Sequence, residues 1–306
     1  MKKILLTVFI LSSIIITSYD AKSFVLYEEK KSLAKTKMDM TGYIDYAPFG
    51  WVDTTNANIY GKFNTVFQPM IDWFIKEYNI EMNYDLYQKK IDDLAQKVRQ
   101  GDIDFFVGAY FETEIFKGLH LLYPAVIYNP ITVFMLPNRI NEVKSTDDLK
   151  KLKGVRNTYE YFSDFVEKKV AELNPMKVDS SYTMFEKLFT READYIITSY
   201  YYGMIEAIKL GLKKQIAPAK QTLWNIPVFV GVSKISQHRD FISKRLTKYL
   251  QDKNNADIIQ KNLQKIISDF EKQYEGVVPP TFGLEKPETT EKQHTSENLD
   301  NNLDAK

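Results

Sequence analysis

The chain is 306 residues long, and its 41 Lys and Arg nearly balance its 40 Asp and Glu, so the formal net charge is +1. This balance gives no support to a nucleic-acid or anionic-membrane partner, because proteins that bind either are usually basic. The absence of cysteine from the sequence excludes a disulfide framework and a lipid-modified N-terminal cysteine. With 44% hydrophobic residues, the length suits two globular domains.

The N-terminus has the pattern of a secretory signal. Lys2 and Lys3 precede an apolar run from Ile4 to Ile16, which is too short for a bilayer core of about 30 Å. Small residues at Ala21 and Ser23 predict a signal peptide over residues 1–23 that is cleaved before Phe24. The alternative is an uncleaved membrane anchor. We therefore expect a soluble protein in a bacterial periplasm, secreted across the inner membrane and not a lipoprotein.

The next part of the chain alternates strand and helix patterns. A hydrophobic strand runs into the turn Asp45–Trp51, and the buried strand Ile103–Ala109 follows a helix that Gly101 stops. That helix has the apolar face Ile91, Leu94, Ala95 and Val98. An earlier helix has the face Phe63, Val66, Phe67, Met70, Ile71 and Phe74, with Pro69 near its start. This order predicts a mostly parallel α/β lobe.

A second α/β lobe is predicted after Pro130. It contains helices that begin after Ser145, around Phe162 and around Met184, and a strand over Tyr195–Thr198. The chain then returns to the first lobe through the strand Ile226–Val232. We assign residues 24–130 and 226–275 to the first lobe, 131–225 to the second, and 276–306 to a disordered polar tail. The two crossings, near 131–136 and 222–232, form a hinge.

The order of several motifs resembles a known family. They are the Pro48-Phe49 turn, Gly101-Asp102-Ile103-Asp104, Leu122-Tyr123-Pro124, Asp147-Asp148-Leu149, and Ala193-Asp194-Tyr195-Ile196-Ile197. From Met40 to Tyr274 the chain resembles the bacterial extracellular solute-binding proteins of family 3. The resemblance implies a type II periplasmic-binding-protein fold, a small solute, most often an amino acid, and an inner-membrane ABC permease as partner. It further implies a monomer without a cofactor.

The chain departs from that family at the ligand. The resemblance places the arginine that binds the ligand carboxylate near Ile115 or Phe116, and the acid that binds its ammonium near Ser199. A buried carboxylate without a partner loses several kcal/mol of hydration, so a free amino acid held in the family manner is not expected. Arg156 is a candidate replacement cation beside a helix N-terminus. Alternatively, Arg156 points into solvent from a strand edge.

Aromatic and polar residues follow several predicted strands. Ligands in open α/β sheets bind beyond the carboxyl ends of strands, in sites lined mainly by apolar and aromatic groups. Core packing and solvated loops are the alternative roles, and we expect about half of the aromatic residues to line the cleft. The predicted binding residues are Asp45, Tyr46, Phe49, Trp51, Tyr110, Glu112, Arg156, Asn157, Thr158, Tyr159, Ser199 and Tyr200.

The leading functional hypothesis is a solute-binding protein without catalytic activity, which takes a small polar or aromatic solute to an ABC transporter. A dehydratase-like enzyme is one alternative, with Glu112, Glu114 or Glu160 as general acid. A secreted ligand sensor for a membrane receptor is another. His120 and His238 lie far apart, and no His or acid cluster has metal-ligand spacing, so no metal site is predicted.

Overall fold

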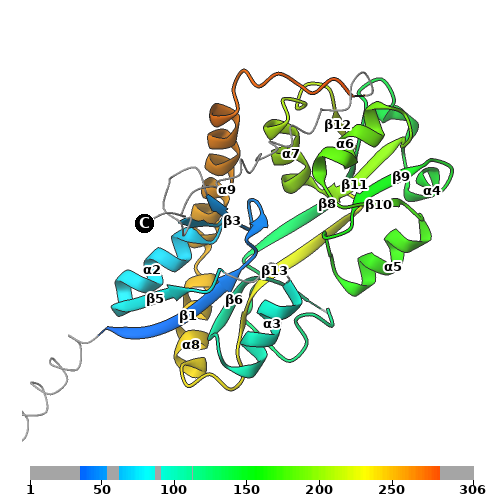
Figure 1. Ribbon diagram of the computed structural model, residues 1–306. Helices are drawn as coiled ribbons and strands as arrows, with labels where there is room; N and C mark the ends of the chain where they lie inside the picture. The colour runs from blue at the N-terminus through cyan, green and yellow to red at the C-terminus, as the bar shows by residue number, and fades with distance from the viewer. Residues whose placement is uncertain (1–34, 54–61, 87–90, 112, 283–306) are drawn as a thin grey trace, which may run out of the picture.

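The computed structural model describes residues 35–53, 62–86, 91–111 and 113–282, which form two α/β lobes (Figure 1). The predicted signal peptide and Glu112 lie outside the described residues. Within the described ranges, no helix combines the length and apolarity needed to cross a bilayer.

The first lobe contains β1 to β7 and the start of β8. Parallel β1 lies between β5 and β6, and α3 packs on β6 while α2 packs on β5. The bounds are β1 Thr36–Gly42, β2 Asp45–Tyr46, β3 Gly50–Asp53, β4 Lys62–Asn64, α2 Gln68–Tyr78, β5 Ile80–Tyr84, α3 Ile91–Gln100, β6 Phe105–Tyr110, β7 His120–Leu121 and β8 Ile127–Met135.

Local sequence signals explain where the helices of this lobe begin and end. Pro69 occupies the first turn of α2, where its missing N–H costs no hydrogen bond. The prediction that Phe63 lies on this helix was wrong, because Phe63 belongs to β4. The Thr65 hydroxyl donates to Phe49 O and accepts from Phe67 N, and these bonds form the turn that separates β4 from α2. Gly101 follows α3 with φ +83°, as predicted for a helix stop.

The second lobe repeats the layered arrangement. Parallel β9 lies between β10 and β11, and the Ser145 side chain caps α4 as predicted. The bounds are the 3-10 helix Ile140–Glu142, α4 Thr146–Leu149, β9 Gly154–Asn157, α5 Asp164–Glu172, β10 Met176–Val178, α6 Ser181–Phe189, β11 Tyr195–Ser199, α7 Tyr200–Lys209 and β12 Ala217–Pro218. The chain returns to the first lobe through β13 Trp224–Val232 and continues into α8 Arg239–Gln251, which packs against α2 and β13, and α9 Lys253–Gln273.

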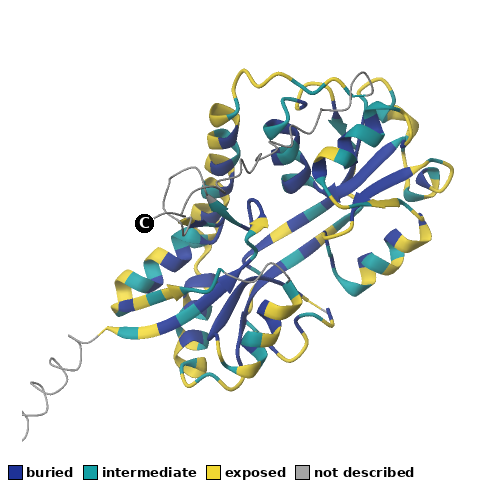
Figure 2. Cartoon of the chain, viewed as in Figure 1, coloured by how far each residue is buried: buried dark blue, intermediate teal, exposed yellow. Residues whose placement is uncertain are grey.

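Two long strands connect the lobes. β8 and β13 pair antiparallel from Ile127 with Val228 to Ile131 with Trp224, and they join both halves into one sheet of order β10-β9-β11-β8-β13-β6-β1-β5. The predicted lobe boundaries at 130/131 and 225/226 fall inside this paired segment. The strands are buried along the centre of each lobe, and exposed residues lie on the outer faces of the helices (Figure 2).

The C-terminal helix touches both lobes. α9 packs against α2 of the first lobe and α7 of the second, and the segment that follows runs across the second lobe (Figure 1). Phe282 stacks on Phe189 with ring centroids 5.1 Å apart and lies 5.4 Å from the Tyr182 ring. The predicted disordered tail therefore does not begin at residue 276, because residues 276–282 have an apolar contact that single-sequence reasoning did not foresee. Residues 283–306 lie outside the described ranges.

This contact predicts a measurable contribution to stability. We expect Phe282→Ala to lower the free energy of unfolding by about 1–2 kcal/mol, because the ring is partly buried. For a chain of this size that change lowers Tm by roughly 2–8 °C. Val278→Ala is the matched control in the same segment, since Val278 is 83% exposed and its loss should have little effect. Equal Tm values for the two variants in thermal denaturation would contradict the packing role.

Candidate functional site

A buried carboxylate lies where the two lobes meet. Glu160 follows β9 of the second lobe and is 4% exposed. Its Oε1 accepts hydrogen bonds from the Tyr46 hydroxyl of the first lobe, from Thr198 Oγ1 and from Ser199 N, each at 2.9 Å. One oxygen atom therefore links the turn after β1 to the end of β11. Tyr46 and Glu160 are 114 residues apart in the sequence.

A second set of polar contacts lies beside the first. Asn129, in the hinge strand β8, donates through Nδ2 to the Tyr110 hydroxyl at 2.9 Å, and its Oδ1 accepts from Ser199 Oγ at 2.5 Å. The Ser199 side chain also caps α7 by accepting from Tyr202 N. Tyr110 ends β6 and Ser199 ends β11, so this set again joins the carboxyl ends of strands from both lobes.

Tyrosine rings surround these polar groups. Tyr43 lies 5.2 Å from Tyr46 and 6.4 Å from Tyr110, measured between ring centroids. Tyr46 lies 4.8 Å from Tyr202 of the second lobe, whose hydroxyl shares a hydrogen bond with Ser181. We call this set the interlobe cluster, and it consists of Tyr43, Tyr46, Tyr110, Asn129, Glu160, Thr198, Ser199 and Tyr202.

Burial decides the titration of the cluster. It raises the pKa of Glu160, although hydrogen bonds from Ser199, Thr198 and Tyr46 and the charge of Arg156 act in the opposite direction. Burial also raises the pKa of Tyr46 well above 10, and the nearby Glu160 carboxylate adds to that rise. The tyrosines are therefore neutral hydrogen-bonding groups at physiological pH. Glu160 is the carboxyl group of the cluster, and its pKa is shifted toward higher pH by burial.

Arg156 lacks one of its two predicted placements, the one in solvent. Its guanidinium is buried, pairs with both oxygens of Glu167 at 2.8 and 3.1 Å, and donates to the backbone oxygen of Glu160. It also lies 5.1 Å from the centroid of the Phe162 ring. It is therefore not directed into solvent. Its donors are engaged within the second lobe, and its role as the replacement cation stays a prediction.

The other predicted binding residues divide into three groups. Tyr46, Tyr110 and Ser199 belong to the interlobe cluster, and Phe49 is fully buried between Phe67 and Tyr201. Others pack or bond within one lobe, and their role in binding stays a prediction. Trp51 packs on Phe270, Tyr200 stacks on Phe134, and the buried Asn157 Oδ1 accepts from Tyr159 N. The remainder, Asp45, Thr158 and Tyr159, are exposed.

Sequence reasoning missed part of the cluster. Asn129 is a polar residue inside an apolar strand, and that break in the pattern was an available signal. Thr198 lies at the end of the predicted strand, and Tyr202 lies two residues after Tyr200, the one tyrosine of this run that was predicted to bind. Glu160 was weighed only as a general acid. Nothing local marks it as buried, because its neighbours Thr158 and Tyr159 are exposed.

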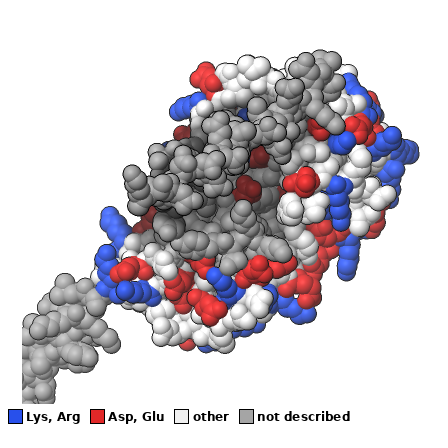
Figure 3. All heavy atoms as spheres, viewed as in Figure 1, with Lys and Arg blue, Asp and Glu red and all other residues white. Residues whose placement is uncertain are grey.

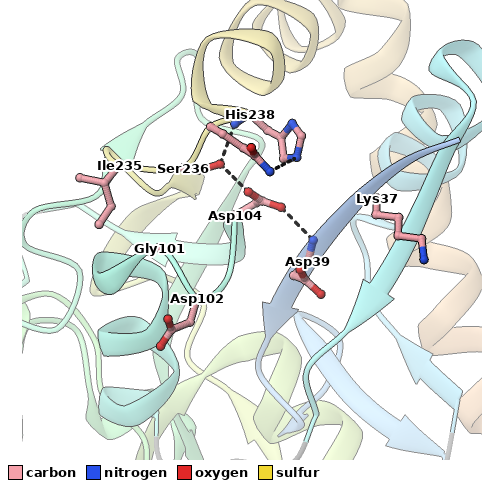
Figure 4. Close-up of a pocket in the computed structure, with 9 residues that line it drawn as sticks. Lys37, Asp39, Gly101, Asp102, Asp104, Ile235, Ser236 and His238 are labelled. Carbon is pink, nitrogen blue, oxygen red and sulfur yellow. Dashed lines mark hydrogen bonds between the residues drawn. The ribbon is translucent and has the colours of Figure 1, made fainter. Parts of the chain in front are cut away.

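A separate cavity of about 390 Å³ lies at the other end of the first lobe (Figure 4). It opens beside the amino ends of β1 and β6, whereas the interlobe cluster lies at their carboxyl ends. Both oxygens of Asp104 are used there: one accepts from Asp39 N at 2.9 Å and the other from the Ser236 hydroxyl. We therefore assign Asp104 a structural role, which is to hold the chain after β13 against β1.

The face in view is hollowed between the two lobes, and Asp or Glu side chains lie inside and along the edge of this hollow (Figure 3). The pKa of Tyr161 is raised by partial burial, by its hydrogen bond to Asp164 and by the charges of Asp164, Glu167 and Asp92. Asp92 belongs to α3 of the first lobe and Asp164 to α5 of the second. Acidic groups from both lobes therefore lie close to Tyr161.

Comparisons with known proteins support the architecture. No protein-family model and no curated protein matches the chain. Among solved structures, an amino-acid ABC transporter substrate-binding protein from Streptococcus pneumoniae, bound to L-arginine, gives a TM-score of 0.59 at 15% identity, covering 80% of this chain and 97% of that one. The ancestral amino-acid-binding protein AncCDT-1, a precursor of cyclohexadienyl dehydratase, gives 0.57 at 13%, covering 77% and 96%.

A histidine kinase sensor domain with similarity to periplasmic binding proteins gives a TM-score of 0.55 at 13% identity, covering 80% of this chain and 99% of that one. The chain has the periplasmic-binding-protein fold. The predicted two-lobed type II architecture is thereby confirmed. In this periplasmic-binding-protein fold, the interlobe cluster lies between the lobes, beside the strands that connect them.

The raised pKa of Glu160 predicts a pH dependence of stability. The folded protein keeps a proton on Glu160 at pH values where the unfolded chain, with a pKa of about 4.3, has released it. The stabilising contribution is present below the unfolded pKa and is lost as pH rises through the folded one. Because glutamine does not titrate, the Tm of wild type should fall relative to that of Glu160→Gln as pH rises from 4 to 8. A constant difference in a thermal-shift titration would contradict this account.

Proposed function

We propose that the protein is a solute-binding protein that captures a small solute between its two lobes in the periplasm and delivers it to an ABC transporter. The observation that carries the proposal is the bond from Tyr46 to Glu160, which joins the lobes through side chains at strand ends. Sites for small molecules in open α/β sheets lie in this position. The solved structures with this fold include amino-acid-binding proteins, which supports a solute of similar size.

The connection between the lobes suits opening and closing. Two antiparallel strands pass between them, and the side-chain contacts across the interface near Glu160 are a hydrogen bond from Tyr46 and ring contacts such as Tyr46 with Tyr202. A rotation about β8 and β13 breaks these few contacts without unfolding either core. Contact of α9 with α2 and α7 limits the direction of such a rotation.

The walls favour a small polar or aromatic solute over a free amino acid held in the usual way. The positions proposed for the family arginine are apolar, since Phe116 is buried and Ile115 packs against the core. Arg156 is bound to Glu167. At these described positions a solute carboxylate therefore finds no arginine free for a bidentate pair, and its burial costs several kcal/mol.

Ligand binding and lobe closure can be measured together. The sequence contains no cysteine, so cysteines at the exposed positions Lys76 of the first lobe and Lys168 of the second can carry a fluorescent donor and acceptor. We expect one class among amino acids, amines, peptides, sugars and organic acids to change the energy transfer. The same class should raise Tm, because a ligand at a hundred times its Kd adds about 2.7 kcal/mol.

The control places both dyes on one lobe. Lys168 and Lys214 are both exposed on the second lobe, and a solute that closes the lobes should leave energy transfer between them unchanged. An equal change of energy transfer in both labelled pairs would indicate that the compound acts on the dyes and not on the lobes. If no class of compound changes either Tm or the signal between lobes, the solute-binding proposal is wrong.

Delivery to a transporter and signalling to a receptor use the same closing lobes. The structural likeness to a sensor domain keeps signalling as a second possibility. Measuring uptake of the identified solute by cells with and without the gene distinguishes transport from signalling. Loss of uptake supports a transport role, whereas normal uptake with a lost transcriptional response supports sensing.

A specific observation also favours a catalytic alternative. Burial raises the pKa of Glu160, as required of a carboxylic acid that protonates a leaving group, and one structural neighbour is described as a dehydratase precursor. Turnover followed by NMR on the bound solute tests it. Turnover in wild type that is lost in Glu160→Gln but kept in Tyr159→Phe would make the protein an enzyme; Tyr159 is 78% exposed.

A further inference from the structure

One oxygen of the buried Glu160 carboxylate has no partner. Oε1 accepts three hydrogen bonds, whereas Oε2 is buried and accepts none from the described residues. A carboxylate oxygen removed from water without a donor costs free energy, and such atoms are uncommon in folded proteins. An unpartnered acceptor at the meeting point of two lobes is the position where a bound molecule would supply the missing donor.

The charges around Glu160 are unbalanced. Arg156 is the guanidinium nearest to its backbone, but it forms a bidentate pair with Glu167. When Glu160 is ionised, two carboxylates therefore share one guanidinium. A bound monocation would compensate this excess negative charge and would favour the ionised form of Glu160.

The rings of the cluster suit the same ligand. Tyr43, Tyr46, Tyr110 and Tyr202 lie within 4.8 to 6.4 Å of a neighbouring tyrosine of the set, measured between centroids. Tyrosine faces attract ammonium and guanidinium groups, more strongly when the site is shielded from water. The hydroxyls remain protonated, because burial raises the pKa of Tyr43 and Tyr46 well above 10. They therefore add no negative charge of their own.

Acidic groups outside the cluster extend the negative field. Asp92 and Asp164 act on Tyr161, and Glu206 and Asp45 act on Tyr202, whose pKa is raised first by burial and then by their charges and that of Glu160. A cleft bordered by charges of one sign concentrates the opposite ion. The field and the unpartnered oxygen thus favour the same kind of molecule.

We propose that the solute is a small organic cation, a primary ammonium or guanidinium compound without a carboxylate beside the charged group, whose N–H donates to Glu160 Oε2 between the tyrosine rings. This inference rests on the proposed solute-binding function. The cation reaches Oε2 when the lobes separate, because Tyr46 covers Glu160 from the first lobe in the closed arrangement. Closure then places the tyrosines of both lobes around the charge.

Matched pairs of compounds test the chemistry without any variant. Each amine is compared with the amino acid that carries the same side chain: agmatine with arginine, cadaverine with lysine, and tyramine with tyrosine. We expect at least one amine to bind at least about a hundredfold more tightly than its amino acid, because the carboxylate has no partner in the cleft. The corresponding neutral compound, such as 4-ethylphenol for tyramine, should bind more weakly as well. Calorimetry gives each Kd.

A substitution at the carboxylate locates the contact. Glu160→Gln keeps an acceptor for the donors of Tyr46, Thr198 and Ser199 but removes the charge, and it should weaken binding of the amine about tenfold or more. Glu172→Gln is the matched control. It removes the same charge from the same lobe at a residue that pairs with Lys169 and does not bond to Glu160. The control should keep the affinity of wild type within about threefold.

The outcomes separate the two proposals. If an amino acid binds as tightly as its amine, or if Glu160→Gln retains the wild-type affinity, the cation assignment is wrong while solute binding stands. Equal losses of affinity in Glu160→Gln and Glu172→Gln would show a general effect of negative charge in place of a direct contact with Glu160, and would also overturn the cation assignment. If no compound of the wider panel binds or closes the lobes, the solute-binding function itself fails.

Discussion

The antiparallel pairing of β8 with β13 is the constraint on which the arrangement depends. It joins the two sheets into one, and it brings the strand ends of both lobes to the same region. Asn129 lies within this paired segment and bonds to Tyr110 on one side and to Ser199 on the other. The element that connects the lobes therefore also positions the candidate site, which couples any rotation of the lobes to the geometry of the cluster.

Glu160 gives this geometry its chemical character. Three donors on Oε1 hold the carboxylate in place, and burial makes its ionisation costly unless a positive charge lies nearby. Arg156 does not supply that charge in full, because Glu167 takes both of its terminal nitrogens. A buried acid of this kind is poorly suited to a purely structural role, since an amide or an apolar side chain would be less costly at the same position.

Much of the fold could be predicted from local patterns. Gly101 ends α3 and Ser145 caps α4, because helix ends are encoded by residues within one turn. Phe63 was assigned to the helix because it lies three and four positions before the apolar Val66 and Phe67. This spacing also arises when a turn separates a strand residue from the helix that follows, as it does here. The contact of Phe282 with Phe189 was missed, since a single aromatic residue in a polar segment carries no periodic signal.

The sequence by itself determined the α/β class, the alternation of strands and helices, and the strand ends where aromatic and polar residues gather, because these depend on periodicity and capping over short distances. Only the tertiary structure decided that Glu160 is buried while Thr158 is exposed, and that Arg156 pairs within its own lobe. The burial and the partners of a charged side chain depend on segments distant in the chain. The hydrogen bond between Tyr46 and Glu160 joins residues 114 positions apart, and no local sequence pattern predicts it.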